Sequence, residues 1–323
     1  MSHVAAVSAP GKLVVLGDHA VVYGHPALVT AVGQRLRAEV TLLDDPVLEL
    51  DAPDVGVTGY RKPLAQLGEG DIPKGAKSVE LALRRFIAAH PIKGGMRVRT
   101  SSEFSASFGF GSSGASAVCV LGAAMQAAEG AIDRRRVFDL AYQSVKDAGS
   151  SGSGIDLAAS AYGGLLYFVT GGKAIEPLTA APPFLIGYTG VKVDTGTIVA
   201  EVKARADAYP AVIDGISRQI TSLVEMAKAA AMKGDLRVFG DAMNFNQGLL
   251  ESLGVGSTKL SQLIFAAREA GALGAKLSGA GKGDCMIALV TPERRAAVAS
   301  AITAAGGTVI DIPCNAEGLR VES

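Results

Sequence analysis

Ahead of a long helical pattern stands the segment Ser107-Phe108-Gly109-Phe110-Gly111-Ser112-Ser113-Gly114-Ala115, and the pattern then continues without interruption to about Glu129. Glycines let the backbone approach an anion closely, and the amides at a helix start point their N–H groups toward it. The serine hydroxyls could add ligands for a phosphate oxygen or for magnesium. The segment predicts a phosphate-binding loop, although Gly/Ser turns before helices are often plain N-caps.

The segment at residues 8–28 places a lysine, an aspartate and a histidine, Lys12, Asp18 and His19, within eight residues of a mostly apolar stretch. Charged side chains are seldom buried without a partner, so this grouping indicates a lined pocket. Each residue also has an ordinary structural explanation. Lys12 could be a solvated turn residue, Asp18 a helix cap and His19 a core histidine whose ring nitrogens are already hydrogen-bonded.

A third glycine-rich segment reads Gly274-Ala275-Lys276-Leu277-Ser278-Gly279-Ala280-Gly281-Lys282-Gly283-Asp284-Cys285. Together, in this order and spacing, the three segments resemble the three signatures of the GHMP kinases. Within that superfamily the first segment is most similar to the mevalonate kinases, which have Gly-Glu-His-Ala-Val where this chain has Gly17-Asp18-His19-Ala20-Val21. The resemblance spans nearly the whole chain.

Several positions depart from the family pattern. Ser105 and Ser107 stand where the family usually has a proline and a further glycine, and Lys282 and Asp284 interrupt the glycines of the third signature. The end of the third signature, Gly283-Asp284-Cys285, and the earlier segment Gly152-Ser153-Gly154-Ile155-Asp156-Leu157-Ala158 look closer to phosphomevalonate kinases. The superfamily is therefore better defined by the sequence than the substrate is.

The resemblance implies an α+β fold of two domains with the active site between them. Residues 1–180 would form an ATP-binding domain similar to ribosomal protein S5 domain 2, and residues 181–323 a ferredoxin-like domain. Prolines 177, 182 and 183 mark the expected boundary. The periodic patterns predict helices at 77–89, 115–129, 133–146 and 292–305, several more between 195 and 270, and strands at 35–43, 96–100, 165–169, 184–188, 285–290 and 308–312. Residues 44–77 predict either a lid or a surface hairpin.

Phosphoryl transfer to an alcohol needs positioning, charge neutralisation and removal of the hydroxyl proton. Asp156 matches the family's catalytic aspartate, although it could simply cap a helix. Lys12 matches the lysine that would stabilise developing negative charge. Ser112 matches the magnesium-ligating serine. The residues expected to bind ATP are Gly109, Phe110, Gly111, Ser112, Ser113, Gly114, Gly279, Ala280 and Gly281.

Substrate contacts are expected from His19, Lys192 and Thr195, although Lys192 could equally be a solvated lysine. The family's acidic magnesium ligand lies upstream of the catalytic aspartate, and counting back without gaps reaches Val145, so another residue supplies that carboxylate or the register shifts. Magnesium prefers hard oxygen ligands, so a carboxylate nearby is expected. Asp147 is the first candidate and Asp18, which replaces the signature glutamate, is the second.

Composition sets further limits. The chain has 323 residues, 49% of them hydrophobic, and a formal net charge of zero, so a nucleic-acid surface is not expected. Three widely spaced cysteines favour neither a disulfide framework nor a zinc site, and they predict a reducing cytoplasmic location. No stretch is apolar enough to span a bilayer. The oligomeric state stays open, a homodimer included.

The sequence as a whole predicts an ATP- and Mg²⁺-dependent kinase that acts on a small alcohol, with mevalonate as the expected acceptor. Phosphomevalonate is the main alternative, because of the two motif variants described above. A non-catalytic GHMP-like binding protein is a further alternative from another class, and intact Lys12, Ser112 and Asp156 argue against it.

Overall fold

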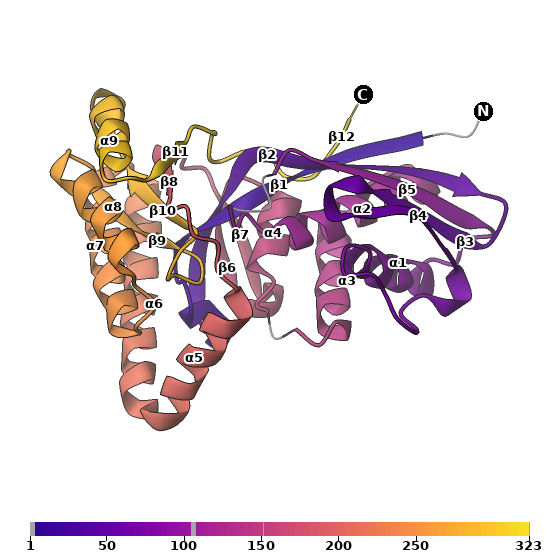
Figure 1. Ribbon diagram of the computed structural model, residues 1–323, viewed down its shortest axis with the longest axis horizontal. Coiled ribbons are helices and arrows are strands. Elements are labelled where there is room, and N and C mark those ends of the chain that lie inside the picture. The colour runs from indigo at the N-terminus through magenta and orange to yellow at the C-terminus, as the bar shows by residue number, and fades with distance from the viewer. Residues whose placement is uncertain (1–3, 105–107, 151, 323) are drawn as a thin grey trace.

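The computed structural model describes residues 4–104, 108–150 and 152–322. The departures at Ser105 and Ser107 lie outside these ranges. Two sheets with helices packed against them form the described part of the molecule, as Figure 1 shows. The predicted α+β class with two domains is confirmed.

The first sheet carries the N-terminal half of the chain. Strand β2 pairs with β1 along nearly its whole length, while β6 and β5 share its other edge at residues 26–30 and 36–43. The strand order is β12-β1-β2-β5-β3-β4, with β7 beyond β6, and only β3 and β5 pair in parallel. The strands are β1 (Val4–Leu16), β2 (Pro26–Leu43), β3 (Val47–Ala52), β4 (Val57–Pro63), β5 (Gly95–Ser102), β6 (Leu165–Val169), β7 (Ala174–Leu178) and β12 (Arg320–Val321).

Helices cover one face of this sheet (Figure 1). Helix α2 lies directly on β1 and β2, and its buried face consists of alanines, glycines and other small or apolar residues that allow a close approach. The helices are α1 (Lys77–Ala89), α2 (Ser112–Glu129), α3 (Arg134–Asp147) and α4 (Ile155–Tyr162). Short 3₁₀ turns occupy Ala20–Tyr23, Pro53–Val55, Leu64–Gln66 and Thr170–Gly172.

The second sheet is antiparallel, with the order β11-β8-β10-β9. Numbered along the chain, this is the order 4-1-3-2 of a β-α-β-β-α-β unit, which matches the expected ferredoxin-like arrangement. Its strands are β8 (Phe184–Tyr188), β9 (Gly274–Ser278), β10 (Cys285–Leu289) and β11 (Thr308–Ile310). The accompanying helices are α5 (Thr195–Ala208), α6 (Pro210–Lys233), α7 (Leu236–Ser252), α8 (Thr258–Glu269) and α9 (Pro292–Ala304).

Local patterns located most of these elements. The predicted helix at 77–89 and the strands at 165–169 and 184–188 have the observed bounds. Residues 44–77 contain the β3–β4 hairpin, so the hairpin alternative is the correct one. The predicted last strand stops at Ile310 rather than 312, and the chain then returns to the first sheet as β12, which the sequence did not predict. The domain boundary at residue 180 stays a prediction.

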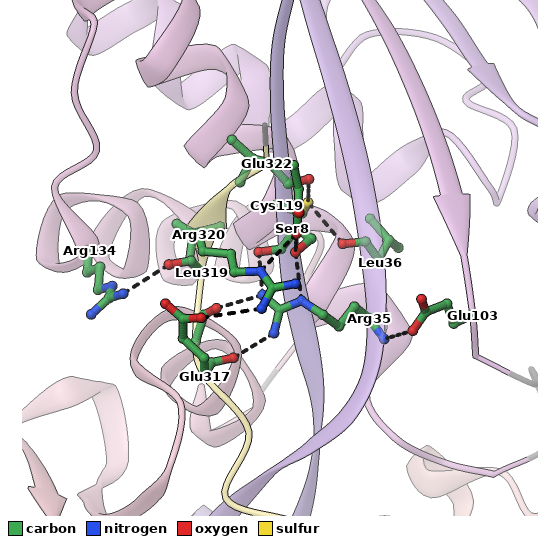
Figure 2. A network of polar contacts seen from close by, with 12 residues as sticks. Ser8, Arg35, Leu36, Glu103, Cys119, Arg134, Glu317, Leu319, Arg320 and Glu322 are labelled. Atoms are coloured by element: carbon green, nitrogen blue, oxygen red, sulfur yellow. Dashed lines mark hydrogen bonds and ion pairs between the residues drawn. The ribbon is translucent and has the colours of Figure 1, made fainter. Parts of the chain in front are cut away.

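The returning C-terminal segment is fastened by Arg35, at the centre of the network in Figure 2. The Arg35 guanidinium donates to Ser8 Oγ at 2.6 Å, to Ser8 O at 2.9 Å, and to the carbonyls of Glu317 and Gly318, both at 2.7 Å. Arg134 adds a bond to the carbonyl of Leu319 at 3.0 Å. One arginine on β2 thus joins β1 to the tail.

Replacing Arg35 with alanine should lower the free energy of unfolding by roughly 1–3 kcal/mol, because several carbonyls lose their charged donor. Arg37→Ala is the matched control on the same strand, since its side chain is 46% exposed and forms one ion pair with Glu39 at 3.4 Å. The control should change stability by no more than about 0.5 kcal/mol. Urea unfolding measures both variants, and equal losses would show that the Arg35 contacts are not what fastens the tail.

Candidate active site

A cavity of about 540 Å³ lies where the two halves of the chain meet. All three glycine-rich segments contribute to its wall, as does the loop after β8. The predicted site residues that line it are Lys12, Asp18, His19, Gly109, Phe110, Gly111, Ser112, Ser113, Asp156, Lys192, Thr195, Gly279 and Ala280. The structure therefore gathers most of the residues chosen from the sequence around a single cavity.

The phosphate loop is held against β1 by its backbone. The amide of Lys12 donates to the carbonyl of Phe110 at 2.9 Å, and the Lys12 ammonium donates to the carbonyl of Gly109 at 3.3 Å. Gly111 adopts a left-handed conformation with φ of 79° and precedes the first turn of α2. The hydroxyl-bearing residues Ser112 and Ser113 are exposed in that turn, where free backbone amides also lie. This arrangement suits an anion such as a nucleotide phosphate.

Two glycines of the loop leave room for the predicted catalytic pair. A Cβ at Gly111 would lie 3.3 Å from Lys12 Cε and 3.4 Å from Asp156 Cβ. A Cβ at Gly114 would lie 2.3 Å from Asp156 Oδ2. Gly114 does not line the cavity itself, so its contribution is the space that it gives to the Asp156 carboxylate.

Asp156 stands in the first turn of α4, and the N-cap of that helix is Gly154, not Asp156. The N-cap position itself therefore belongs to Gly154, while the backbone amides of Asp156 and Leu157 at the helix start also interact with the carboxylate. Burial raises the pKa of Asp156 above its ordinary value, and the nearby Lys12 ammonium acts in the opposite direction. A carboxylate with a raised pKa, facing a cavity beside a lysine, fits a proton acceptor.

Asp18 and His19 both contact the third glycine segment. Asp18 Oδ1 accepts from the amide of Gly279 at 2.7 Å, and Oδ2 accepts from the buried ammonium of Lys276 at 2.6 Å. His19 Nε2 lies 2.9 Å from the carbonyl of Ala280. A carbonyl can only accept, so Nε2 carries the hydrogen and Nδ1 is left as an acceptor in the neutral ring. Burial lowers the pKa of His19, which favours this neutral form.

The cavity is also lined by Lys192, by Thr195 and by Asp284, an aspartate that was not predicted as a site residue. Asp284 Oδ1 lies 3.4 Å from Lys192 Nζ, and a Cβ at Gly109 would lie 2.9 Å from Asp284 Oδ2. Asp284 has φ of 51°, a left-handed conformation that disfavours residues other than glycine. The sequence signal for it was its position among the glycines of the third segment.

Two other predicted residues do not line the cavity. Asp147 forms an ion pair with Arg85, Nε to Oδ2 at 2.5 Å, and Gly281 packs on Val255, where a Cβ would lie 2.2 Å from the Val255 carbonyl. Within the described ranges no three His, Cys, Asp or Glu side chains gather as a metal site. Serines 150 and 153 also line the cavity beside Asp156, and only their place in a Gly/Ser run indicated them.

Comparison with known proteins identifies the class. The family models "GHMP kinases N terminal domain" and "GHMP kinases C terminal" match residues 76–164 and 226–308. A mevalonate kinase of Pyrococcus abyssi is 34% identical over 333 residues, covering 100% of this chain and 99% of the relative. The chain belongs to the GHMP kinases. Within that family, the Pyrococcus abyssi relative, which this chain matches over its full length, is a mevalonate kinase.

Solved structures agree on the fold. The mevalonate kinase of Methanococcus jannaschii superposes with a TM-score of 0.79 at 22% identity, covering 100% of this chain and 99% of that one. The phosphomevalonate kinase of Streptococcus pneumoniae, in complex with phosphomevalonate and AMPPNP, gives 0.81 at 20%, covering 96% and 99%. Because both fit equally well, the fold alone does not separate the two substrates. None of the helices that the structure describes combines the length and apolar character of a bilayer-crossing segment.

Gly114→Ala tests the space reserved for Asp156. Alanine suits a helix better than glycine, so stability should not fall through the backbone, but the new methyl must displace the carboxylate. We expect kcat to fall roughly 10–100-fold, since a displacement near 1 Å costs about that much. Gly248→Ala in α7, where nothing lies within 4 Å of the added Cβ, is the control and should keep the normal kcat. Unchanged kcat in Gly114→Ala would contradict the assignment.

The pH dependence of kcat tests the Asp156 carboxylate itself. Only the ionised form can accept a proton, so activity should fall as pH drops through the raised pKa of Asp156, at a higher pH than the ordinary value of 3.8 implies. Lys12→Met removes a charge that lowers this pKa, so the acid limb of its residual activity should move to higher pH. Lys203→Met, which removes an exposed lysine paired with Asp207, should leave the limb in place. An acid limb unmoved by Lys12→Met would exclude the pairing.

Proposed function

We propose that this protein is a mevalonate kinase, which transfers the γ-phosphoryl group of ATP to the 5-hydroxyl of mevalonate and forms 5-phosphomevalonate for isoprenoid biosynthesis. The observation that carries the proposal is the presence of Lys12 and Asp156 in one cavity, on a chain that matches a mevalonate kinase over its full length. A cytoplasmic location and a homodimer stay predictions.

The polar groups of the cavity that were singled out above each take a part in this reaction. Asp156 accepts the proton of the acceptor hydroxyl as the new bond to phosphorus forms. Lys12, which already contacts the loop carbonyl of Gly109, stabilises negative charge that develops on the transferred group. The amides and hydroxyls at the start of α2 hold the nucleotide phosphates. His19 Nδ1 is free to accept a hydrogen bond from a mevalonate hydroxyl, and Lys192 supplies a cation for its carboxylate.

Magnesium fits this site as an ion held chiefly by the nucleotide. The exposed hydroxyl of Ser112 would supply one protein oxygen, and phosphate oxygens and water would complete the octahedral shell. The ion would neutralise charge on the phosphates. Asp147 lies away from the cavity and both Asp18 oxygens already accept hydrogen bonds, so the geometry favours neither as a direct ligand.

Phosphomevalonate remains the second candidate acceptor because of Gly283-Asp284-Cys285. A phosphate ester brings about two more negative charges than an alcohol. Among the described lining residues the lysines and arginines are Lys12 and Lys192, and Asp284 lies against the second of these. A cavity with so few unpaired cations suits the singly charged mevalonate better.

A coupled assay of ADP release tests the proposal across mevalonate, phosphomevalonate, homoserine and galactose. We expect mevalonate to be the fastest acceptor, and Asp156→Asn to lower kcat roughly 10²–10⁴-fold while the melting temperature changes little. Faster turnover of phosphomevalonate would transfer the assignment to the second candidate. Silence on every acceptor would favour a binding protein, and a destabilised Asp156→Asn with normal kcat would mean that the residue is structural.

A further inference from the structure

A lysine behind the cavity wall joins the two halves of the molecule. Lys276 lies on β9 of the second sheet, and Asp18 follows β1 of the first. Their side chains are both 0% exposed, and Nζ lies 2.6 Å from Oδ2. The same ammonium also donates to the carbonyl of Leu277. Residues 258 positions apart thus form a fully buried ion pair across the two sheets.

Stability alone is a weak reason to keep such a pair. Removing two charges from water costs much of what their attraction returns, and apolar side chains of similar volume often stabilise a protein as well or better. Burial lowers the pKa of Lys276, in agreement with this cost, and Asp18 counteracts the shift. Buried polar groups whose hydrogen bonds are all satisfied can instead rigidify the chain and specify one arrangement of it.

The pair belongs to a set of four contacts between the same two segments, which we call the clasp. Besides Lys276–Asp18, the clasp consists of the Gly279 amide on Asp18, the His19 ring on the Ala280 carbonyl, and the Ser278 hydroxyl on the Val14 carbonyl at 2.9 Å. The other clasp side chains line the cavity, but Lys276 does not. Lys276 therefore acts on the cavity only through its partners.

His19 is held by the clasp through both its backbone surroundings and its ring. Its backbone is held at φ of 61°, which costs energy for a residue other than glycine and persists only where the surroundings enforce it. Its ring direction is set by the Ala280 carbonyl, and the preceding amide of Gly279 is set by Asp18. Asp18 is in turn held by Lys276. The orientation of His19 thus follows from a buried charge that never reaches the substrate.

We propose that Lys276 is a positioning residue for the acceptor side of the site, holding Asp18 and through it the His19 ring at one orientation. The proposal rests on the proposed function, since it assigns His19 to the acceptor. It goes beyond that function in giving a role in catalysis to a residue that touches neither substrate.

Steady-state kinetics of Lys276→Met test it, with kcat referred to the folded fraction from circular dichroism. We expect KM for mevalonate to rise about tenfold and KM for ATP to rise by a clearly smaller factor, because the loop and α2 carry most of the predicted ATP-binding residues and the clasp includes only Gly279 and Ala280 of that set. Normal KM values with kcat unchanged per folded molecule would show a purely structural role. A rise in KM for ATP alone would also overturn the proposal.

Lys62→Met is the matched control. Lys62 pairs with Glu80 at 2.6 Å, its side chain is only 13% exposed and that of Glu80 is fully buried, and neither lines the cavity. This variant should lose stability yet keep both KM values. A tenfold rise in its KM for mevalonate would mean that any lost buried pair has this effect.

Lys276→Met leaves the Asp18 carboxylate buried without its partner, which is strongly destabilising, so a second variant is needed that removes this charge. Adding Asp18→Asn removes the unpaired charge and replaces the carboxylate with an amide of the same shape. The double variant should fold and still show the raised KM for mevalonate; a normal KM would overturn the proposal. Failure of the proposed function is separate, because it appears as a wild-type protein that does not phosphorylate mevalonate. If another acceptor is preferred, the same comparison is made with that acceptor.

Discussion

Strand β1 and the phosphate loop touch through their backbones, and the cavity depends on this contact. The Lys12 amide bonds to the Phe110 carbonyl at 2.9 Å, and a Cβ at Gly11 would lie 2.9 Å from the same oxygen. A side chain at position 11 would push the loop outward. The close approach places the Lys12 ammonium under the loop, where the absence of side chains at Gly111 and Gly114 leaves room for it and for Asp156.

The remaining walls come from chain segments that are distant in sequence. β9 and its following turn bring Ser278, Gly279 and Ala280 to the end of β1, and the loop after β8 brings Lys192. No single segment holds enough of the site to bind a substrate alone. The cavity therefore exists only once both sheets are formed and joined, and the C-terminal strand β12 on β1 adds a further link between the two halves of the chain.

Local chemistry explains which features were predictable. Helix α1 and strands β6 and β8 follow from periodicity and from flanking prolines or glycines, so their bounds could be read from the sequence. The gathering of Lys12, Asp156 and the loop followed from family signatures rather than from any local rule. Strand β12 has only two residues, which is too short for a periodic pattern. The tail before it is held by Arg35 on β2, a contact distant in sequence that no local pattern reveals.

Choosing Asp147, the carboxylate two residues from Val145, did not identify a magnesium ligand, and helix geometry explains why. Successive residues of an α-helix turn by about 100°, so residue 147 faces about 200° away from residue 145. Val145 faces the cavity side, where its Cγ1 would lie 3.9 Å from a Cβ at Gly152, while Asp147 faces Arg85 of α1. The gap-free count therefore places an apolar side chain, Val145, where the family's glutamate is expected, so another residue supplies that carboxylate or the register shifts. On the proposed function, a site without an acidic ligand at that position would leave Lys12 and the loop amides to balance the charge on the nucleotide and its ion, and the contact between β1 and the loop would matter correspondingly more.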